Sequence, residues 1–230
     1  MTDTQAATRK IRLWDLPLRL FHWSLLLLVV GAVVSAEIAD EVSGAMDWHP
    51  RFGYAILTVL LFRLIWGFVG GTHARFSNFV RGPAAVAGYL RLFRTHRAPS
   101  IGHNPLGALS VVALLTSLLL QAVSGLFLNV EDFGIEGPLF KHVSNAVADV
   151  FWEIHEINPG VLIALVALHV AAILFYRIVK REDLVTPMLT GNKRVPEGHA
   201  ESEAQGGSVI RGAVVLALAA LAVWFIANKV

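Results

Sequence analysis

Two histidines in one long apolar stretch are the first candidates for chemistry. The segment EIHEINPGVLIALVALHV, residues 153–170, contains His155 and His169 fourteen positions apart. On an α-helix this separation advances about 21 Å and turns through roughly 1400°, about 40° short of four full turns. The two imidazoles are therefore predicted to lie on one helix face at two depths. Ionisable side chains inside an apolar helix are energetically costly and are usually functional.

Each of these histidines has a counterpart at a similar depth. His22 lies three residues after Arg19, near the start of the first apolar run, and His49 opens the second run from its far end. Depth therefore pairs His22 with His169 and His49 with His155. Two imidazoles that face each other at one level can bind a haem iron from both axial positions. The pattern predicts two haem sites with these four histidines as iron ligands.

Arg63 lies fourteen residues after His49, on a segment expected to run parallel to the one that holds His155 and His169. It should therefore reach the level and face of His169. A buried guanidinium needs a counter-ion, and a haem propionate is a suitable one. The alternative is that the side chain extends to the lipid headgroups.

Pro159 follows His155 by four residues. Because proline has no N–H, the carbonyl of His155 loses its helical donor. A bend or a bound water is expected there and would shape the site of His49 and His155.

The composition is typical of an integral membrane protein. Of 230 residues, 55% are hydrophobic and 16% are charged, and the mean hydropathy is +0.61, whereas soluble domains have about 25% charged residues. A membrane-spanning helix needs roughly 20 apolar residues. Five runs meet or approach this length, the second interrupted only by Arg63: residues 20–36, 52–72, 105–130, 157–176 and 212–228.

These runs predict an all-α integral membrane fold. We expect four transmembrane helices within residues 1–189, a polar linker (residues 190–210) and a fifth, C-terminal transmembrane helix (residues 211–230). An amphipathic stretch that begins at Pro83 is expected to lie on the lipid surface. The sequence has no cysteine, which excludes disulfides, thiolate catalysis, cysteinyl iron–sulfur clusters and covalently attached c-type haem.

The distribution of charge predicts the orientation. The connection at 71–103 has five arginines and no acid, and residues 177–194 have five bases, whereas the connections near 37–47 and 129–153 together have nine acids and one lysine. Lys and Arg collect on the cytoplasmic side. The protein should lie in the bacterial inner membrane with a cytoplasmic N-terminus and a periplasmic C-terminus. The basic start resembles a signal peptide, but its apolar run is too long and cleavage would discard His22.

Four stretches resemble the bacterial cytochrome b561 family, which includes the b-type cytochrome subunits of nickel-iron hydrogenases and formate dehydrogenases. They are LWDLPLRLFHW, WHPRFGYAILTVLLFRLIWGFVG, HNPLGAL and EIHEINPGVLIALVALHV, within residues 12–180. The resemblance implies a four-helix bundle with two b haems, ligated by one histidine each from the first two helices and two from the fourth. These positions are His22, His49, His155 and His169. The fifth helix and Pro159 depart from the family pattern.

The other histidines are not expected to bind iron. His103 precedes Asn104 and Pro105, which is typical of a helix cap. The remaining four lie in connections or in the linker: His73, His96, His142 and His199.

Two haems with two histidine ligands each leave no open iron position for oxygen or substrate, which indicates electron transfer. The expected circuit joins membrane quinone, either ubiquinone or menaquinone, to a periplasmic c-type cytochrome, dehydrogenase or hydrogenase subunit with a basic docking face. One alternative is a superoxide oxidase that reduces quinone, but the acidic outer connections would repel superoxide. A metal or proton transporter is a second alternative, and it leaves the depth pairing unexplained. No nucleic-acid partner is expected.

Overall fold

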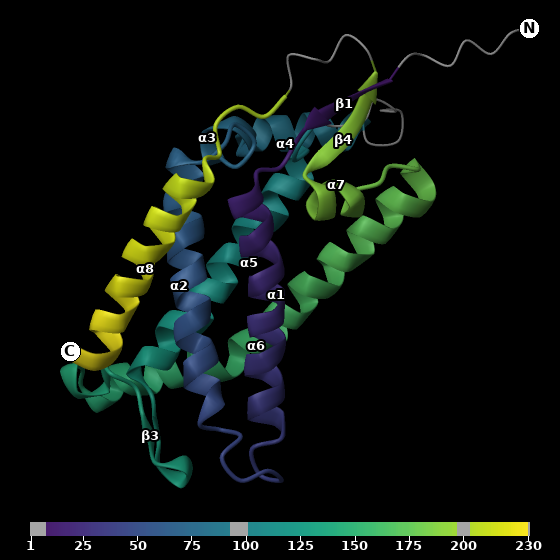
Figure 1. Ribbon diagram of the computed structural model, residues 1–230. Coiled ribbons are helices and arrows are strands. Elements are labelled where there is room, and N and C mark those ends of the chain that lie inside the picture. The colour runs from purple at the N-terminus through teal and green to yellow at the C-terminus, as the bar shows by residue number, and fades with distance from the viewer. Residues whose placement is uncertain (1–7, 93–100, 197–202, 230) are drawn as a thin grey trace, which may run out of the picture.

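The computed structural model describes residues 8–92, 101–196 and 203–229 (Figure 1). Within these ranges, five helices are long and apolar enough to cross a membrane, which confirms the predicted all-α membrane architecture. They are α1 (Leu16–Glu37), α2 (Trp48–Val69), α5 (Pro105–Ser124), α6 (Asn145–Phe175) and α8 (Val209–Lys229). A 3-10 turn, η1 (Gly125–Phe127), extends α5, and a π-helical turn, η4 (Tyr176–Lys180), extends α6.

Two of the spanning helices begin at side-chain caps followed by proline. Asp15 Oδ1 accepts a hydrogen bond from the backbone N–H of Leu18 at 2.8 Å, and Asn104 Oδ1 accepts one from Gly107 at 2.8 Å. Such caps satisfy the free N–H groups of a first helical turn, where proline is also tolerated. α6 begins at Asn145, well before the apolar run at 157, because its first turns are amphipathic and carry acidic residues.

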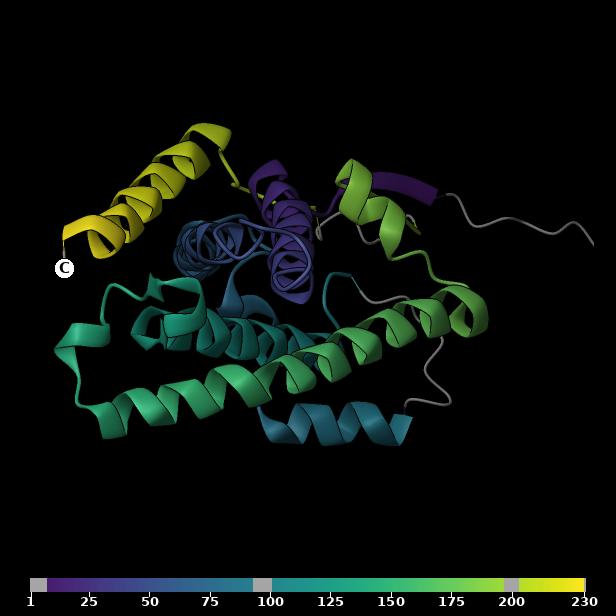
Figure 2. The same ribbon diagram turned by 90° about the horizontal axis from the view of Figure 1, so that it is seen from below.

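α2 lies at the centre of the bundle. It packs against α1, α5 and α8, and α5 in turn packs against α6. Viewed along the bundle, α8, α2 and α1 form one layer, α5 lies beneath them and α6 lies beyond α5 (Figure 2). We call the end where α1 and α5 begin the upper end and the end where α2 and α6 begin the lower end, as they appear in Figure 1.

A buried carboxylate joins three elements at the upper end. Asp15, which caps α1, also accepts hydrogen bonds from Trp66 Nε1 at 3.1 Å and from the backbone N–H of Gly71 at 3.1 Å. The surrounding core includes Val215 and Ala219 of α8. The fifth helix therefore shares a hydrophobic core with the first two.

Short elements cover the upper end. β1 (Thr8–Arg12) pairs antiparallel with β4 (Asn192–Pro196), so part of the expected linker at 190–210 forms a strand next to the N-terminus. Three helices complete this end: α3 (Phe76–Phe79), α4 (Pro83–Leu92) and α7 (Val185–Thr190). α4 is the amphipathic stretch predicted after Pro83, and its expected continuation through residues 93–97 lies outside the described residues.

The lower end has a small hairpin between α5 and α6. It consists of β2 (Asn129–Val130), the turn η2 (Glu131–Phe133) and β3 (Ile135–Glu136), followed by η3 (Phe140–His142). Gly134 occupies the turn with φ of 64°, a conformation that glycine adopts without strain.

Candidate functional site

At the lower end, His49 and His155 face each other across the bundle. His49 is the second residue of α2, and His155 lies on α6. Their ring centroids are 6.1 Å apart and the ring planes are inclined by 77°. Two helices that are distant in sequence thus bring two imidazoles together at one level. We call this pair the lower site.

Both histidines of the lower site have the Nδ1 atom held by a hydrogen bond. His49 Nδ1 lies 2.9 Å from the carbonyl oxygen of Ala32, so it must donate. His155 Nδ1 lies 3.1 Å from Ser124 Oγ, whose hydroxyl already donates to the carbonyl of Gln121 at 3.0 Å. Ser124 Oγ therefore accepts from His155. Each ring therefore carries a proton on Nδ1, which leaves Nε2 for a metal ion.

The backbone around His155 is supported from α5. The carbonyl of His155, which lacks a helical donor because of Pro159, accepts a hydrogen bond from Gln121 Nε2 at 3.0 Å. The sequence predicted a bend or a water at this position and did not identify Gln121. A Cβ atom on Gly125 would lie 3.1 Å from His155 Cε1, so glycine allows the close approach of the two helices.

The upper site consists of His22 on α1 and His169 on α6. The two imidazoles are close enough to interact electrostatically. His22 Nδ1 is buried and has no hydrogen-bond partner among the described residues. One pair of histidines therefore lies toward each end of the bundle.

Arg63 is buried on α2, three residues before Trp66, whose Nε1 donates to Asp15 at the upper end. The Arg63 side chain is 2% exposed, and its guanidinium carbon lies 4.6 Å from the ring centroid of Phe76. One of its terminal nitrogens, NH1, is buried with no hydrogen-bond partner among the described residues. A guanidinium enclosed in this way does not extend to the headgroups, and it still needs an anionic partner.

His103 also lies at the upper end, although its position before Asn104 and Pro105 predicted only a helix cap. The cap is made by Asn104, and His103 lies between the rings of Trp14 and Phe79, at centroid distances of 4.8 Å and 4.6 Å. Burial, and secondarily the Arg63 guanidinium, lower the pKa of His103 to about 3, so the ring is neutral. Its Nδ1 atom is buried without a partner among the described residues.

These donor sets fit a haem. Among the described residues, no three His, Cys, Asp or Glu side chains gather in one place as a metal-ion site, whereas imidazole pairs match the two axial positions of a haem iron. Buried polar atoms are normally hydrogen-bonded. The carboxylates of a bound iron porphyrin would satisfy the unpartnered nitrogens of Arg63 and His103, and the imidazoles of His22 and His169 would hold its iron.

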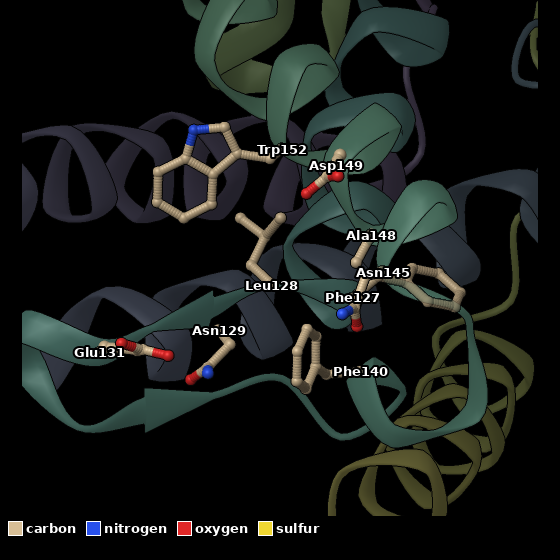
Figure 3. A pocket seen from close by; sticks show the side chains of 9 residues that line it. All are labelled: Phe127, Leu128, Asn129, Glu131, Phe140, Asn145, Ala148, Asp149 and Trp152. Carbon is tan, nitrogen blue, oxygen red and sulfur yellow. The ribbon is translucent and has the colours of Figure 1, made fainter.

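A pocket of about 370 Å³ opens at the lower end, between the hairpin and the start of α6 (Figure 3). Trp152, Phe140 and Phe127 contribute aromatic rings to its lining, and Glu131 and Asp149 contribute carboxylates. Trp152 precedes His155 by three residues, which corresponds to about 4.5 Å along the helix axis. The pocket is therefore adjacent to the lower site.

Comparison with known proteins gives a consistent picture. The family model of prokaryotic cytochrome b561 matches residues 13–191. A protein of Azotobacter vinelandii named "Probable Ni/Fe-hydrogenase B-type cytochrome subunit" is 29% identical, with 82% of this chain and 92% of that protein covered. Proteins of the same name from Azotobacter chroococcum mcd 1 and Rhizobium leguminosarum bv. viciae are 28% and 21% identical, covering 82% and 80% of this chain and 92% and 89% of theirs. No solved structure matches the chain.

Proposed function

Since the chain belongs to the prokaryotic cytochrome b561 family, we propose that it carries electrons across a membrane through two b-type haems. The observation that supports this most directly is the arrangement of four histidines as two pairs, one toward each end of a membrane-spanning bundle. A haem supplies one-electron redox chemistry. The protein supplies the two sites and the separation between them.

Each site is proposed to hold its haem iron between two imidazoles. At the lower site, His49 and His155 present Nε2 because Ala32 and Ser124 hold their Nδ1 atoms. At the upper site the ligands are His22 and His169. With two imidazole ligands at each site, neither iron would have an open position for oxygen or substrate, which supports a role in electron transfer.

The upper end is proposed to face the cytoplasm of a bacterial inner membrane. Its described elements include the basic strands β1 and β4, with Arg9, Lys10, Arg12, Lys193 and Arg194, and the arginines near α3 and α4. Lys and Arg are retained on the cytoplasmic side. The lower site then lies toward the periplasm, and the C-terminus at the end of α8 is periplasmic.

The electron partners are proposed to be membrane quinone, either ubiquinone or menaquinone, and a periplasmic redox protein. The names of the relatives favour a nickel-iron hydrogenase subunit as the periplasmic partner, with a c-type cytochrome or another dehydrogenase as the next candidate. Electrons would enter or leave the protein near the lower site on that side.

The acidic lower surface supports a partner with a basic docking face. Lys141 is paired with Glu136 at 2.9 Å, and Arg51, a base at this end that lies within α2, rests over the Trp48 ring at 4.8 Å. Neither cation pairs with Glu131 or Asp149 of the pocket. Carboxylates beside aromatic rings suit a Lys or Arg side chain from a partner, and the position next to His155 suits electron transfer.

The test is the haem content of the purified protein. We expect a b-type absorption spectrum and two haems per chain, both extracted by acid acetone because no cysteine attaches them. A colourless preparation that binds metal ions would refute the proposal and favour a transporter. A single haem would refute the pairing of the four histidines.

A further inference from the structure

Five buried side-chain nitrogen atoms have no hydrogen-bond partner among the described residues: Nε of Arg19, Nδ1 of His22, NH1 of Arg63, Nε of Arg75 and Nδ1 of His103. Of these residues, Arg63 is 2% exposed, and His103 interacts with it electrostatically. We therefore consider Arg63 and His103 together. An unpaired donor in a protein interior is costly, and an unpaired buried guanidinium is more so. Arg63 and His103 therefore point to an acceptor group that lies between them.

The packing of α3 brings these two side chains to one place. Phe79 contacts the His103 ring and Phe76 contacts the Arg63 guanidinium, while the two phenylalanine rings are 5.8 Å apart. Gly67 permits this arrangement, because a Cβ atom there would lie 2.0 Å from the Phe76 ring. The arrangement therefore depends on a glycine in the last turn of α2.

The protein offers Arg63 no ion-pair partner within the part of the chain that the structure describes. Asp15 is the acid that interacts with it electrostatically. However, the carboxylate of Asp15 is occupied by Trp66 and by the backbone N–H groups of Leu18 and Gly71. The connection from 71 to 92 carries arginines and no acid. The described residues therefore leave Arg63 without an acidic acceptor, and a bound group would supply one.

We propose that His103 and Arg63 bind the propionate carboxylates of the haem held by His22 and His169. This inference rests on the proposed function and adds a residue outside the four ligands. His103 interacts electrostatically with both Arg63 and His169, so it lies beside the upper site and not the lower one. Because the ring is neutral, it contributes one N–H donor, whereas Arg63 contributes the positive charge.

The test compares variants of His103 in the whole membrane protein by redox titration of both haems. His103→Leu removes the donor, so the propionate becomes less well compensated and the midpoint potential of the upper haem should shift downward. His103→Asn places an amide N–H near the position of Nδ1 and should restore the wild-type value. His142→Leu, at an exposed histidine of the lower end, is the matched control and should change neither potential.

Reconstitution with haem dimethyl ester, which has no free carboxylates, identifies the group that His103 contacts. With this haem, wild type and His103→Leu should have the same upper-haem potential. An equal shift with both haems would overturn the proposal, because His103 would then act through packing or through the iron ligands. Equal potentials for wild type and His103→Leu with ordinary haem would overturn it as well.

Misfolding of the variant, a role in quinone binding and failure of the proposed function can each be distinguished from these outcomes. If His103→Leu does not fold, His103→Ala removes the same donor without adding bulk between Trp14 and Phe79, and the same comparison applies. Unchanged potentials together with weakened quinone reduction would assign the donors to a quinone and reject the propionate. Failure of the proposed function would show instead as absence of haem from the wild-type protein.

Discussion

Gln121 donates a hydrogen bond from Nε2 to the backbone carbonyl of His155, at 3.0 Å, across the interface of α5 and α6. Pro159 cannot supply the helical N–H for that carbonyl. The amide oxygen of Gln121 in turn accepts from Asn158 Nδ2 at 2.8 Å, and Asn158 Oδ1 accepts from Ser117 at 2.9 Å. A polar network between α5 and α6, near the lower site, therefore fixes the backbone of a proposed iron ligand.

Replacement of Gln121 should lower the stability of the protein and alter the lower site. Gln121→Leu leaves the carbonyl of His155 without its side-chain donor, which costs roughly 1–3 kcal/mol for a buried group. It also removes one of the two hydrogen bonds that Asn158 Nδ2 donates, while the bond to the carbonyl of Ser117 remains. We expect earlier unfolding in a detergent or heat titration and an altered electron paramagnetic resonance signal for the lower haem alone. Leu120→Ala, at a lipid-facing position on the same turn, is the control. An unchanged lower haem in Gln121→Leu would show that the network does not orient His155.

Each single histidine substitution should remove one haem, and the two histidines of one site should give the same loss. His22→Ala or His169→Ala should remove the upper haem, and His49→Ala or His155→Ala should remove the lower one, because each site takes its two ligands from different helices. Haem content and redox titration distinguish the two components. Loss of the same component in His22→Ala and His49→Ala would refute the pairing.

Arg63→Leu should lower the midpoint potential of the upper haem more than that of the lower haem. A fixed cation nearby favours the reduced haem, which is less positive, and its removal favours the oxidised form. Arg63→Lys retains the charge and should recover most of the potential, although not the two-pronged geometry of a guanidinium. If both potentials stay at the wild-type values in Arg63→Leu, the buried cation has a structural role only.

Helical periodicity explains why so much of this arrangement could be predicted. The spacing of His155 and His169 fixes both their face and their depths, since a membrane helix has one axis and a constant rise. The same argument placed Arg63 at the level of His169. Length and hydropathy predicted the spanning helices because a bilayer sets the length of a helix that crosses it.

The residues that were missed depend on partners from other helices. Gln121 has no local signature, because its role comes from the carbonyl that Pro159 leaves free on α6. His103 lies next to Asn104, which caps α5. Only the packing of Trp14 and Phe79 shows that the His103 ring is enclosed. The pairing of β1 with β4 joins segments about 180 residues apart, which no periodicity reveals.

The acidic lower surface should steer a basic partner. The acids of the two lower connections are Glu37, Asp40, Glu41, Asp47, Glu131, Asp132, Glu136, Asp149 and Glu153. A surface of one sign accelerates encounter with the opposite charge, and salt weakens the effect as the screening length falls from about 10 Å at 0.1 M to about 3 Å at 1 M. We expect reduction of the lower haem by a cationic c-type cytochrome, followed by stopped flow, to slow as salt rises.

The pocket beside His155 indicates which acids should contribute most to the salt-dependent rate. The double variant Glu131→Gln and Asp149→Asn removes the carboxylates that border Trp152, so it should lower the association rate about threefold at low salt and converge with wild type at high salt. Glu203→Gln, at the upper end, changes charge on the opposite side of the membrane and should leave the rate unchanged.

Translocated connections avoid Lys and Arg for reasons of topology, so absence of bases alone is no evidence for docking. The decisive result is the salt series, since a rate that is flat or rises with salt would reject steering by this surface and favour an anionic reductant such as superoxide.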